Sequence, residues 1–131
     1  MTSLPDAELD VLARLERGGE MTAGDLREAL ASERPLAHAS VMTLLQRLEA
    51  KSLVRRRKAP AGKAFLFSAT GRARPALRRL LARLADRAFG GDPVSVVASL
   101  FETSAPSADE LQRLEQLLAE LRARRRPGGR P

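Results

Sequence analysis

The 131 residues suffice for one domain of ordinary size, or for two small domains that share a core. The chain has no cysteine, which excludes disulfides, thiolate metal sites and cysteine nucleophiles, and its low aromatic content argues against recognition by base stacking. The formal net charge of +7 is unevenly placed, because residues 1–50 carry five basic and nine acidic side chains whereas residues 51–87 carry twelve basic and one acidic. Such a concentrated basic block attracts polyanions, so we expect a nucleic acid as the partner.

The composition argues against several other classes of protein. No apolar run approaches the length of a membrane span, and the chain turns polar at once at Leu4-Pro5-Asp6, so we expect a cytoplasmic protein without membrane insertion. An enzyme is not expected, because the chain has one histidine, no phosphate-binding glycine-rich loop and no acidic pair within an apolar run. No second histidine or cysteine can join His38 as a metal ligand, so we expect neither a metal nor a cofactor.

The first part of the chain predicts a helix-turn-helix. Residues 6–17 carry apolar side chains at helical spacing up to a Gly-Gly pair, and residues 23–30 predict a second helix with Thr22 and Asp25 as a capping box. Pro35 then breaks the chain before a third helix. Two short helices joined by a short connection, with another helix before them, are typical of a helix-turn-helix.

The stretch Leu36–Ser68 organises the rest of the chain, and it opens with an amphipathic helix. One face of this helix is the apolar stripe Val41, Leu44, Leu45 and Leu48. The opposite face is weakly charged and carries small, apolar and amide-bearing side chains, which suit base edges and thymine methyl groups. We predict that Thr43 and Gln46 read bases. The predicted apolar contacts are Ala39 and Met42.

A β-hairpin with a basic, flexible tip is predicted directly after this recognition helix. Residues 53–58 and 64–68 form its strands, and residues 59–63 form its turn. A helix suited to reading bases, followed by a basic hairpin, indicates a winged helix-turn-helix. The expected fold class is therefore mainly α, with three helices plus a β-hairpin wing over residues 1–70, followed by a helical dimerisation region.

The basic side chains of the recognition helix and the wing are candidates for contacts with phosphate groups. The predicted phosphate contacts are Ser40, Arg47, Lys51, Arg55, Arg56, Arg57, Lys58 and Lys63. Only alternate side chains of a strand share a face, so some of the arginines at 55–57 are expected to be merely solvated. Arg72 and Arg74 extend this track. Arg47 is equally a candidate for an ion pair with the acidic first half, and His38 for a helix cap or a phosphate contact.

Three more helices are predicted in the second half of the chain. The first spans residues 76–89, Asp92 caps the second with proline in its first turn, and Ser107 opens the third with Glu110 as its capping-box partner. Residues 123–131 are rich in arginine, proline and glycine and predict a disordered basic tail.

These three helices carry more apolar side chains than they can bury among themselves. We therefore expect residues 71–122 to hold a homodimer, and the alternative is that they pack back onto the N-terminal domain. A two-fold dimer places two recognition helices about one DNA turn apart on a pseudo-palindromic site. The predicted dimerisation residues are Leu77, Leu80, Leu81, Leu84, Val97, Leu100, Phe101, Leu111, Leu114, Leu118 and Leu121.

Short motifs spread over residues 4–122 match a known family in their order and spacing. The matching stretches are Pro5–Leu9, Leu44–Leu48 with Lys51, Lys63–Phe65, Phe89–Gly91 and Ser107–Leu111. In these motifs the chain resembles the penicillinase-repressor family, the BlaI/MecI/CopY-type transcriptional regulators. The resemblance implies a bacterial repressor that binds operator DNA as a homodimer and controls β-lactam-resistance or related stress genes.

The resemblance also implies how such a repressor is released, and the chain departs from the family there. In the best-known members a membrane-bound sensor detects β-lactams and causes proteolysis of the repressor. The cut falls in the helix before the last one, at an Asn-Phe pair, and this chain has Ser99-Leu100 at that position. The copper-responsive members use a cysteine-rich tail, which this chain lacks. Pro5 replaces a Ser or Thr cap, and Ser52 stands where glycine usually follows the recognition helix.

Two other functions remain open on the sequence. One is a winged-helix regulator that a small-molecule ligand induces. The other is a non-specific architectural or RNA-binding protein that uses only the basic block.

Overall fold

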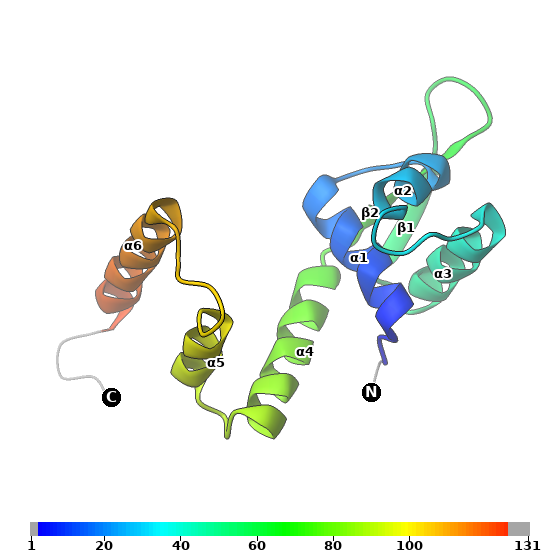
Figure 1. Ribbon diagram of the computed structural model, residues 1–131. Helices are drawn as coiled ribbons and strands as arrows, with labels where there is room; N and C mark the ends of the chain where they lie inside the picture. Colours follow the sequence, from blue (N-terminus) through cyan, green and yellow to red (C-terminus); the bar gives the residue numbers. More distant parts are fainter. Residues whose placement is uncertain (1–2, 126–131) are drawn as a thin grey trace. The chain divides into compact units, whose positions relative to one another are not determined.

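In the computed structural model, the described part of the chain is residues 3–125, which form six α-helices and one antiparallel hairpin (Figure 1). The elements in chain order are α1 (Asp6–Gly18), α2 (Ala23–Leu30), α3 (His38–Ala50), β1 (Val54–Lys58), β2 (Phe65–Ala69), α4 (Ala73–Ala88), α5 (Pro93–Leu100) and α6 (Ala108–Arg124). The chain divides into two compact units between Arg83 and Leu84, within α4. The predicted mainly α fold with three helices and a hairpin wing is confirmed.

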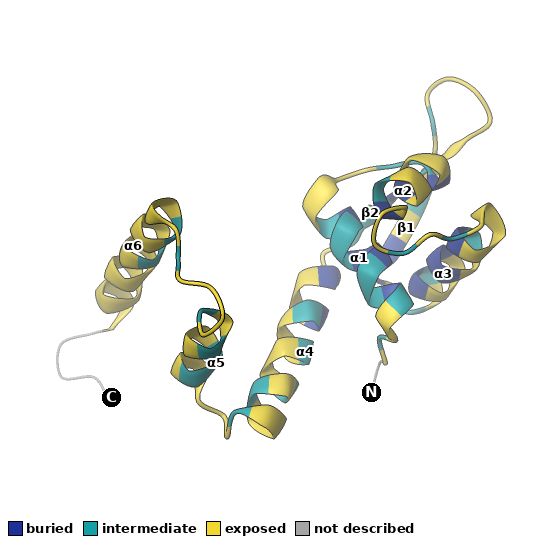
Figure 2. Ribbon diagram, viewed as in Figure 1, coloured by how far each residue is buried: buried dark blue, intermediate teal, exposed yellow. Residues whose placement is uncertain are grey.

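The core of the first unit lies among α1, α2, α3 and β2. The predicted stripe of α3 is buried, and it packs with leucines of α1 and α2 and with the fully buried Phe67 of β2. Figure 2 shows the buried residues gathered in α1–α3, the hairpin and the start of α4. Burying leucine, valine and phenylalanine side chains stabilises the fold by about 1.5–3 kcal/mol each. Leu9 of α1 and Ala29 of α2 are only partly buried.

Capping confirms most of the predicted helix starts. The Asp25 N–H donates to the hydroxyl of Thr22 at the start of α2 (3.0 Å), but no return bond from the Thr22 N–H to the Asp25 carboxylate is found within residues 3–125. Asp92 caps α5 by accepting from the Val94 N–H (3.0 Å), with Pro93 at the first helical position. The capping box predicted for α2 is therefore only half formed.

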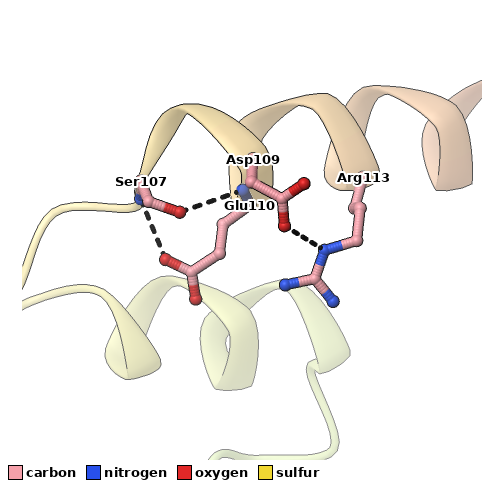
Figure 3. Close-up of polar contacts among 4 residues, drawn as sticks. All are labelled: Ser107, Asp109, Glu110 and Arg113. Carbon is pink, nitrogen blue, oxygen red and sulfur yellow. Dashed lines mark hydrogen bonds and ion pairs between the residues drawn. The ribbon is translucent and has the colours of Figure 1, made fainter.

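The capping box of α6 is complete, as Figure 3 shows. The Glu110 N–H donates to the Ser107 hydroxyl (3.1 Å), and the Ser107 N–H donates to the Glu110 carboxylate (2.9 Å). One turn later Arg113 pairs with Asp109 at 3.0 Å. Because α6 continues to Arg124, the predicted start of a disordered tail at residue 123 is wrong. The rest of that predicted tail, from residue 126, lies outside the described residues.

The hairpin is paired in the register Val54↔Ala69, Arg56↔Phe67 and Lys58↔Phe65, and its second strand starts one residue later than predicted. The segment before α2 also joins it, which the sequence did not predict. Met21 and Phe67 exchange two backbone hydrogen bonds, of 2.9 and 2.7 Å. This bridge fixes the base of the wing to the helix-turn-helix.

The recognition helix α3 ends in a left-handed turn at Ser52. Ser52 has φ of 63° and is the only non-glycine residue with positive φ in the described part of the chain. The Leu53 N–H donates to the Leu48 carbonyl (3.0 Å) and the Ser52 N–H to the Glu49 carbonyl (2.9 Å), which is the Schellman arrangement. The expectation that a serine stands here in a left-handed cap is confirmed.

Replacing this serine by glycine is expected to stabilise the protein. A residue with a Cβ atom in the left-handed region destabilises the folded state by about 1–2 kcal/mol, and glycine avoids this cost. Glycine offsets part of that gain because its unfolded chain has more conformational entropy to lose on folding. We therefore expect Ser52→Gly to raise the free energy of unfolding by about 1 kcal/mol, measured by urea denaturation. The matched control Gly19→Ala, at φ of 77°, should lower it. A destabilised Ser52→Gly variant would contradict this account.

The first two turns of α4 belong to the first unit. Ala73 and Ala76 are buried and Leu77 is partly buried against the same core, so this unit continues past the predicted domain boundary at residue 70. α4 begins three residues earlier than predicted, because Pro75 falls in its first turn, where no intrahelical N–H bond is lost. For this segment the alternative of packing back onto the N-terminal domain is the correct one, and Leu77 is corrected from a dimerisation residue to a core residue.

The second unit contains α5 and α6, and neither helix has a buried residue. Val94, Val97 and Leu100 of α5 are exposed. Four leucines of α6 are likewise exposed: Leu111, Leu117, Leu118 and Leu121. In the same unit Phe101 and Leu114 are partly buried and Leu84 is more than half exposed. At the end of the first unit, Leu80 is partly buried and Leu81 is more than half exposed. Helices with this many apolar side chains in water lack a core of their own.

Candidate nucleic-acid interface

The outward face of α3 is available to a ligand. Because its four apolar side chains point into the core, a second set faces solvent: His38, Ala39, Ser40, Thr43, Gln46 and Arg47. Ala37 occupies the N-cap position and no side chain caps the helix, so the capping role considered for His38 is wrong. The uncapped N–H groups of the first turn favour an anion such as phosphate.

Two of the predicted base contacts, Met42 and Thr43, make contacts within the protein that the sequence did not predict. Met42 is partly buried and packs against the hydrophobic core, so we correct it from a base contact to a core-side residue. The Thr43 hydroxyl donates to the Ala39 carbonyl one turn earlier (3.0 Å). This back-bond engages the hydroxyl hydrogen, so Thr43 offers its methyl group and an acceptor oxygen rather than a donor.

Lys51 has an internal partner. Its ammonium group donates to the carboxylate of Glu8 and to the carbonyl of Ser3 (2.6 Å). Glu8 is 3% exposed and is the only buried charged residue in the described part of the chain. A carboxylate this deeply buried requires a cation beside it. The prediction that Lys51 contacts phosphate is therefore corrected: this lysine joins the end of α3 to the start of α1.

Arg56 is held between the recognition helix and the wing. Its guanidinium donates two hydrogen bonds to the Glu49 carboxylate, at 2.9 and 2.5 Å. Its central carbon lies 5.1 Å from the ring centroid of Phe65 and 5.0 Å from that of Phe67. The bonds to Glu49 raise the pKa of Arg56. With these partners Arg56 is a link between α3 and the hairpin, and its predicted phosphate contact is corrected accordingly.

Arg57 points to the other face of the strand and pairs with Glu20. Two hydrogen bonds of 2.7 Å join the guanidinium to the carboxylate, and they lower the pKa of Glu20 and raise that of Arg57. The Arg57 side chain is still 56% exposed. An ion pair this exposed is weak, so Arg57 remains accessible to a phosphate group.

The other predicted cations of the interface are exposed. None of the ion pairs found within residues 3–125 involves Arg47, Arg55, Lys58 or Lys63. The ion-pair alternative considered for Arg47 is thus wrong. Arg47 therefore adds an exposed positive charge to the outward face of α3, and Arg55, Arg57, Lys58 and Lys63 add exposed positive charge to the wing, as phosphate recognition requires.

A small open pocket of about 460 Å³ lies elsewhere in the first unit. It is lined by the end of α1, residues 68–71 and the start of α4, including Glu16, Arg74 and Arg78. Arg74 pairs with Glu16 across it at 3.4 Å, so Arg74 is not simply an extension of the phosphate track, whereas Arg72 is exposed. In the described residues no group of three or more His, Asp or Glu side chains is close enough to hold a metal ion.

The sequence missed the acidic partners Glu8, Glu20 and Glu49. Only one of them carries a local signal: Glu49 precedes the basic block by a few residues and can face a hairpin that folds back on α3. Glu8 and Glu20 lie 43 and 37 residues from their partners, so no local pattern connects the pairs.

A comparison with protein families places this geometry among known proteins. The family model described as penicillinase repressor matches residues 4–120, which is most of the chain. No curated protein matches the chain. Among residues 3–125 no helix has both the length and the apolar character that crossing a membrane requires.

Solved structures share the fold at low sequence identity. The chain is similar to YusO from Bacillus subtilis, with 18% identity, a TM-score of 0.56 and coverage of 92% of this chain and 76% of that one. It is similar to a mutant of MarR from E. coli solved with operator DNA, with 22% identity, a TM-score of 0.56 and coverage of 91% and 76%. Bordetella bronchiseptica BpsR gives 21% identity, a TM-score of 0.55 and coverage of 92% and 76%. At these identities the likeness shows the fold alone.

Proposed function

The chain belongs to the penicillinase-repressor family and is a DNA-binding transcriptional regulator, and from this premise we propose that it is a homodimeric repressor of an inverted-repeat operator. The observation that carries the proposal is the outward face of α3, whose exposed side chains are mostly small or polar, together with the exposed cations of the wing that follows it. A B-DNA major groove admits one α-helix, and its edges are lined with phosphate. The small and polar side chains of α3 suit the base edges inside the groove, and the cations of the wing suit the phosphate groups along its edges.

In this proposal base reading and positioning are divided between different side chains. Gln46 pairs with adenine through its amide, and Thr43 and Ala39 contact thymine methyl groups. The phosphate contacts are made by Ser40 and by the exposed cations defined above, Arg47, Arg55, Arg57, Lys58 and Lys63, with Arg72 beyond them. His38 adds a contact at the start of α3.

The second unit, together with the last residues of the first unit on α4, supplies the proposed homodimer interface. Its exposed side chains on α5 and α6 need an apolar cover, and a second copy of the chain offers the same surface under two-fold symmetry. The proposed interface residues are Leu80, Leu81, Leu84, Val97, Leu100, Phe101, Leu111, Leu114, Leu118 and Leu121, with Val94 and Leu117 added because they are exposed. Two recognition helices then bind half-sites about one turn of DNA apart.

We also propose the genes and the signal that the family implies. The repressor acts in the cytoplasm on β-lactam-resistance or related stress genes, and a membrane-bound sensor protease is the partner in its release. The position that corresponds to the family's cleavage pair is Ser99-Leu100 at the end of α5. Incubation with membranes that carry the sensor and its β-lactam should then cut the chain at this position; an intact chain would remove the protease from the proposal.

Selection of bound duplexes from a random pool tests the proposed function. We expect an enriched inverted repeat whose half-sites are centred about 10 base pairs apart or a multiple of this distance. Enrichment of no sequence would favour a non-specific architectural protein. Tighter binding to bulk RNA than to the selected duplex, in a competition assay, would favour the RNA-binding alternative.

Gln46→Ala is expected to relax specificity at one base step. Losing a bidentate amide contact costs about 1–3 kcal/mol of discrimination on the selected operator. Binding to random DNA should not change, because the amide carries no charge. Fluorescence anisotropy on operator and random duplexes measures both affinities, with Gln112→Ala on α6 as the matched control. An equal loss on both duplexes would exclude Gln46 from base reading.

A further inference from the structure

Glu49 is an acidic side chain beside the face that the proposed function assigns to DNA. It lies in the last turn of α3, three residues after Gln46, where a negative charge opposes both the helix dipole and approaching phosphate groups. Its carboxylate is three-quarters covered and is bound by the Arg56 guanidinium in a two-bond fork. A negative charge at this position weakens DNA binding, so its presence suggests a structural role that offsets this cost.

The fork connects α3 with the outer part of the wing. Arg56 stands on β1, and its guanidinium also covers the rings of Phe65 and Phe67, its diagonal and direct neighbours on β2. Phe67 is anchored in the core and in the bridge to Met21, whereas Phe65 lies where the hairpin runs out toward its tip. The stack therefore ties the outer half of both strands to the end of α3.

The second wing arginine provides a contrast. Arg57 forms a similar fork with Glu20, but it is twice as exposed as Arg56, at 56% against 28%, and within residues 3–125 it covers no aromatic ring. Glu20 also lies outside α3, in the segment before α2. The two pairs share their chemistry, but only the first one joins the wing to the recognition helix.

We propose that the Glu49–Arg56 fork, stacked on Phe65 and Phe67, is a positioning device that holds the wing at a set place relative to α3. This inference rests on the proposed function. Glu49 and Arg56 touch no DNA in it: they fix where Arg55, Lys58 and Lys63 meet the phosphate groups while Gln46 faces the bases. Preorganised contacts bind more tightly because the wing loses less freedom on binding.

The direction in which one substitution changes the operator affinity distinguishes the positioning role from a purely electrostatic one. Glu49→Gln removes a negative charge near DNA, so charge alone predicts tighter binding. The positioning role predicts the reverse, a loss of about tenfold in operator affinity. The control Glu20→Gln frees an exposed arginine and should bind as tightly as the parent or more tightly. Tighter binding of Glu49→Gln would overturn the inference.

Arg56→Lys tests the geometry of the fork at constant charge. A lysine cannot form the two parallel bonds, so we expect the same loss as in Glu49→Gln, and no further loss in the double variant. Hydroxyl-radical footprints should lose protection under the wing and keep it under α3. An Arg56→Lys variant with parental affinity would show that Arg56 acts only as a charge.

Amide hydrogen exchange of the free protein tests, in the absence of DNA, whether the Glu49–Arg56 fork holds the wing in place. Glu49→Gln should speed exchange in β1 and β2 while α1 and α3 keep the parental rates, and a melting curve shows that the variant is folded. Unchanged hairpin exchange would overturn the positioning role whether or not the parent selects an operator. Failure of the parent to select any duplex would instead count against the proposed function.

Discussion

Leu114→Lys combined with Leu118→Lys is expected to give a monomer that binds its operator about 100-fold more weakly, because the second half-site is then no longer held by a linked subunit. Leu118 is 47% exposed and Leu114 is only partly buried, so lysine disturbs little within one chain. In the proposed dimer the same positions lie in an apolar interface, where two charges per subunit are strongly unfavourable.

Light scattering and binding to a single half-site measure this effect. The mass should halve, while the affinity for one half-site should stay at the parental monomer value. Gln112→Lys combined with Gln116→Lys places the same charge on exposed polar positions of α6 and should leave the dimer intact. An unchanged mass of the leucine variant, with circular dichroism showing a folded chain, would refute the proposed dimer interface.

Lys51→Met is expected to lower the free energy of unfolding by about 2–3 kcal/mol. The substitution leaves the buried Glu8 carboxylate without its cation, and an unpaired buried charge costs about 3–5 kcal/mol when it is fully enclosed. Because the Lys51 side chain is about a quarter exposed, water reduces that cost. The lost bond to the Ser3 carbonyl also loosens the segment before α1.

The salt dependence of DNA binding shows whether Lys51 is structural. The slope of log affinity against log salt should be unchanged in Lys51→Met, because no phosphate contact is lost. The matched control Lys63→Met, at an exposed position of the wing, should flatten the slope by about one unit and leave stability unchanged. A Lys51→Met variant of parental stability with a flatter slope would restore Lys51 to the phosphate contacts.

The helices and the wing were predictable because their signals are local. The spacing of Val41, Leu44, Leu45 and Leu48 identified the buried face of α3, and hence its outward face. The capping box at Ser107 and the proline after Asp92 marked two helix starts to the residue. These signals operate within one or two turns, so they can be recognised without knowing what packs against them.

The roles of individual cations were not predictable in the same way. Sequence alone determined that a basic wing follows a recognition helix and that the later helices carry unburied apolar stripes. Only the tertiary structure decided that Lys51 and Arg56 hold the fold together while Arg55 and Lys58 remain exposed. The physical reason is that a cation's role depends on which carboxylate folds against it, and the partner of Lys51 is 43 residues away.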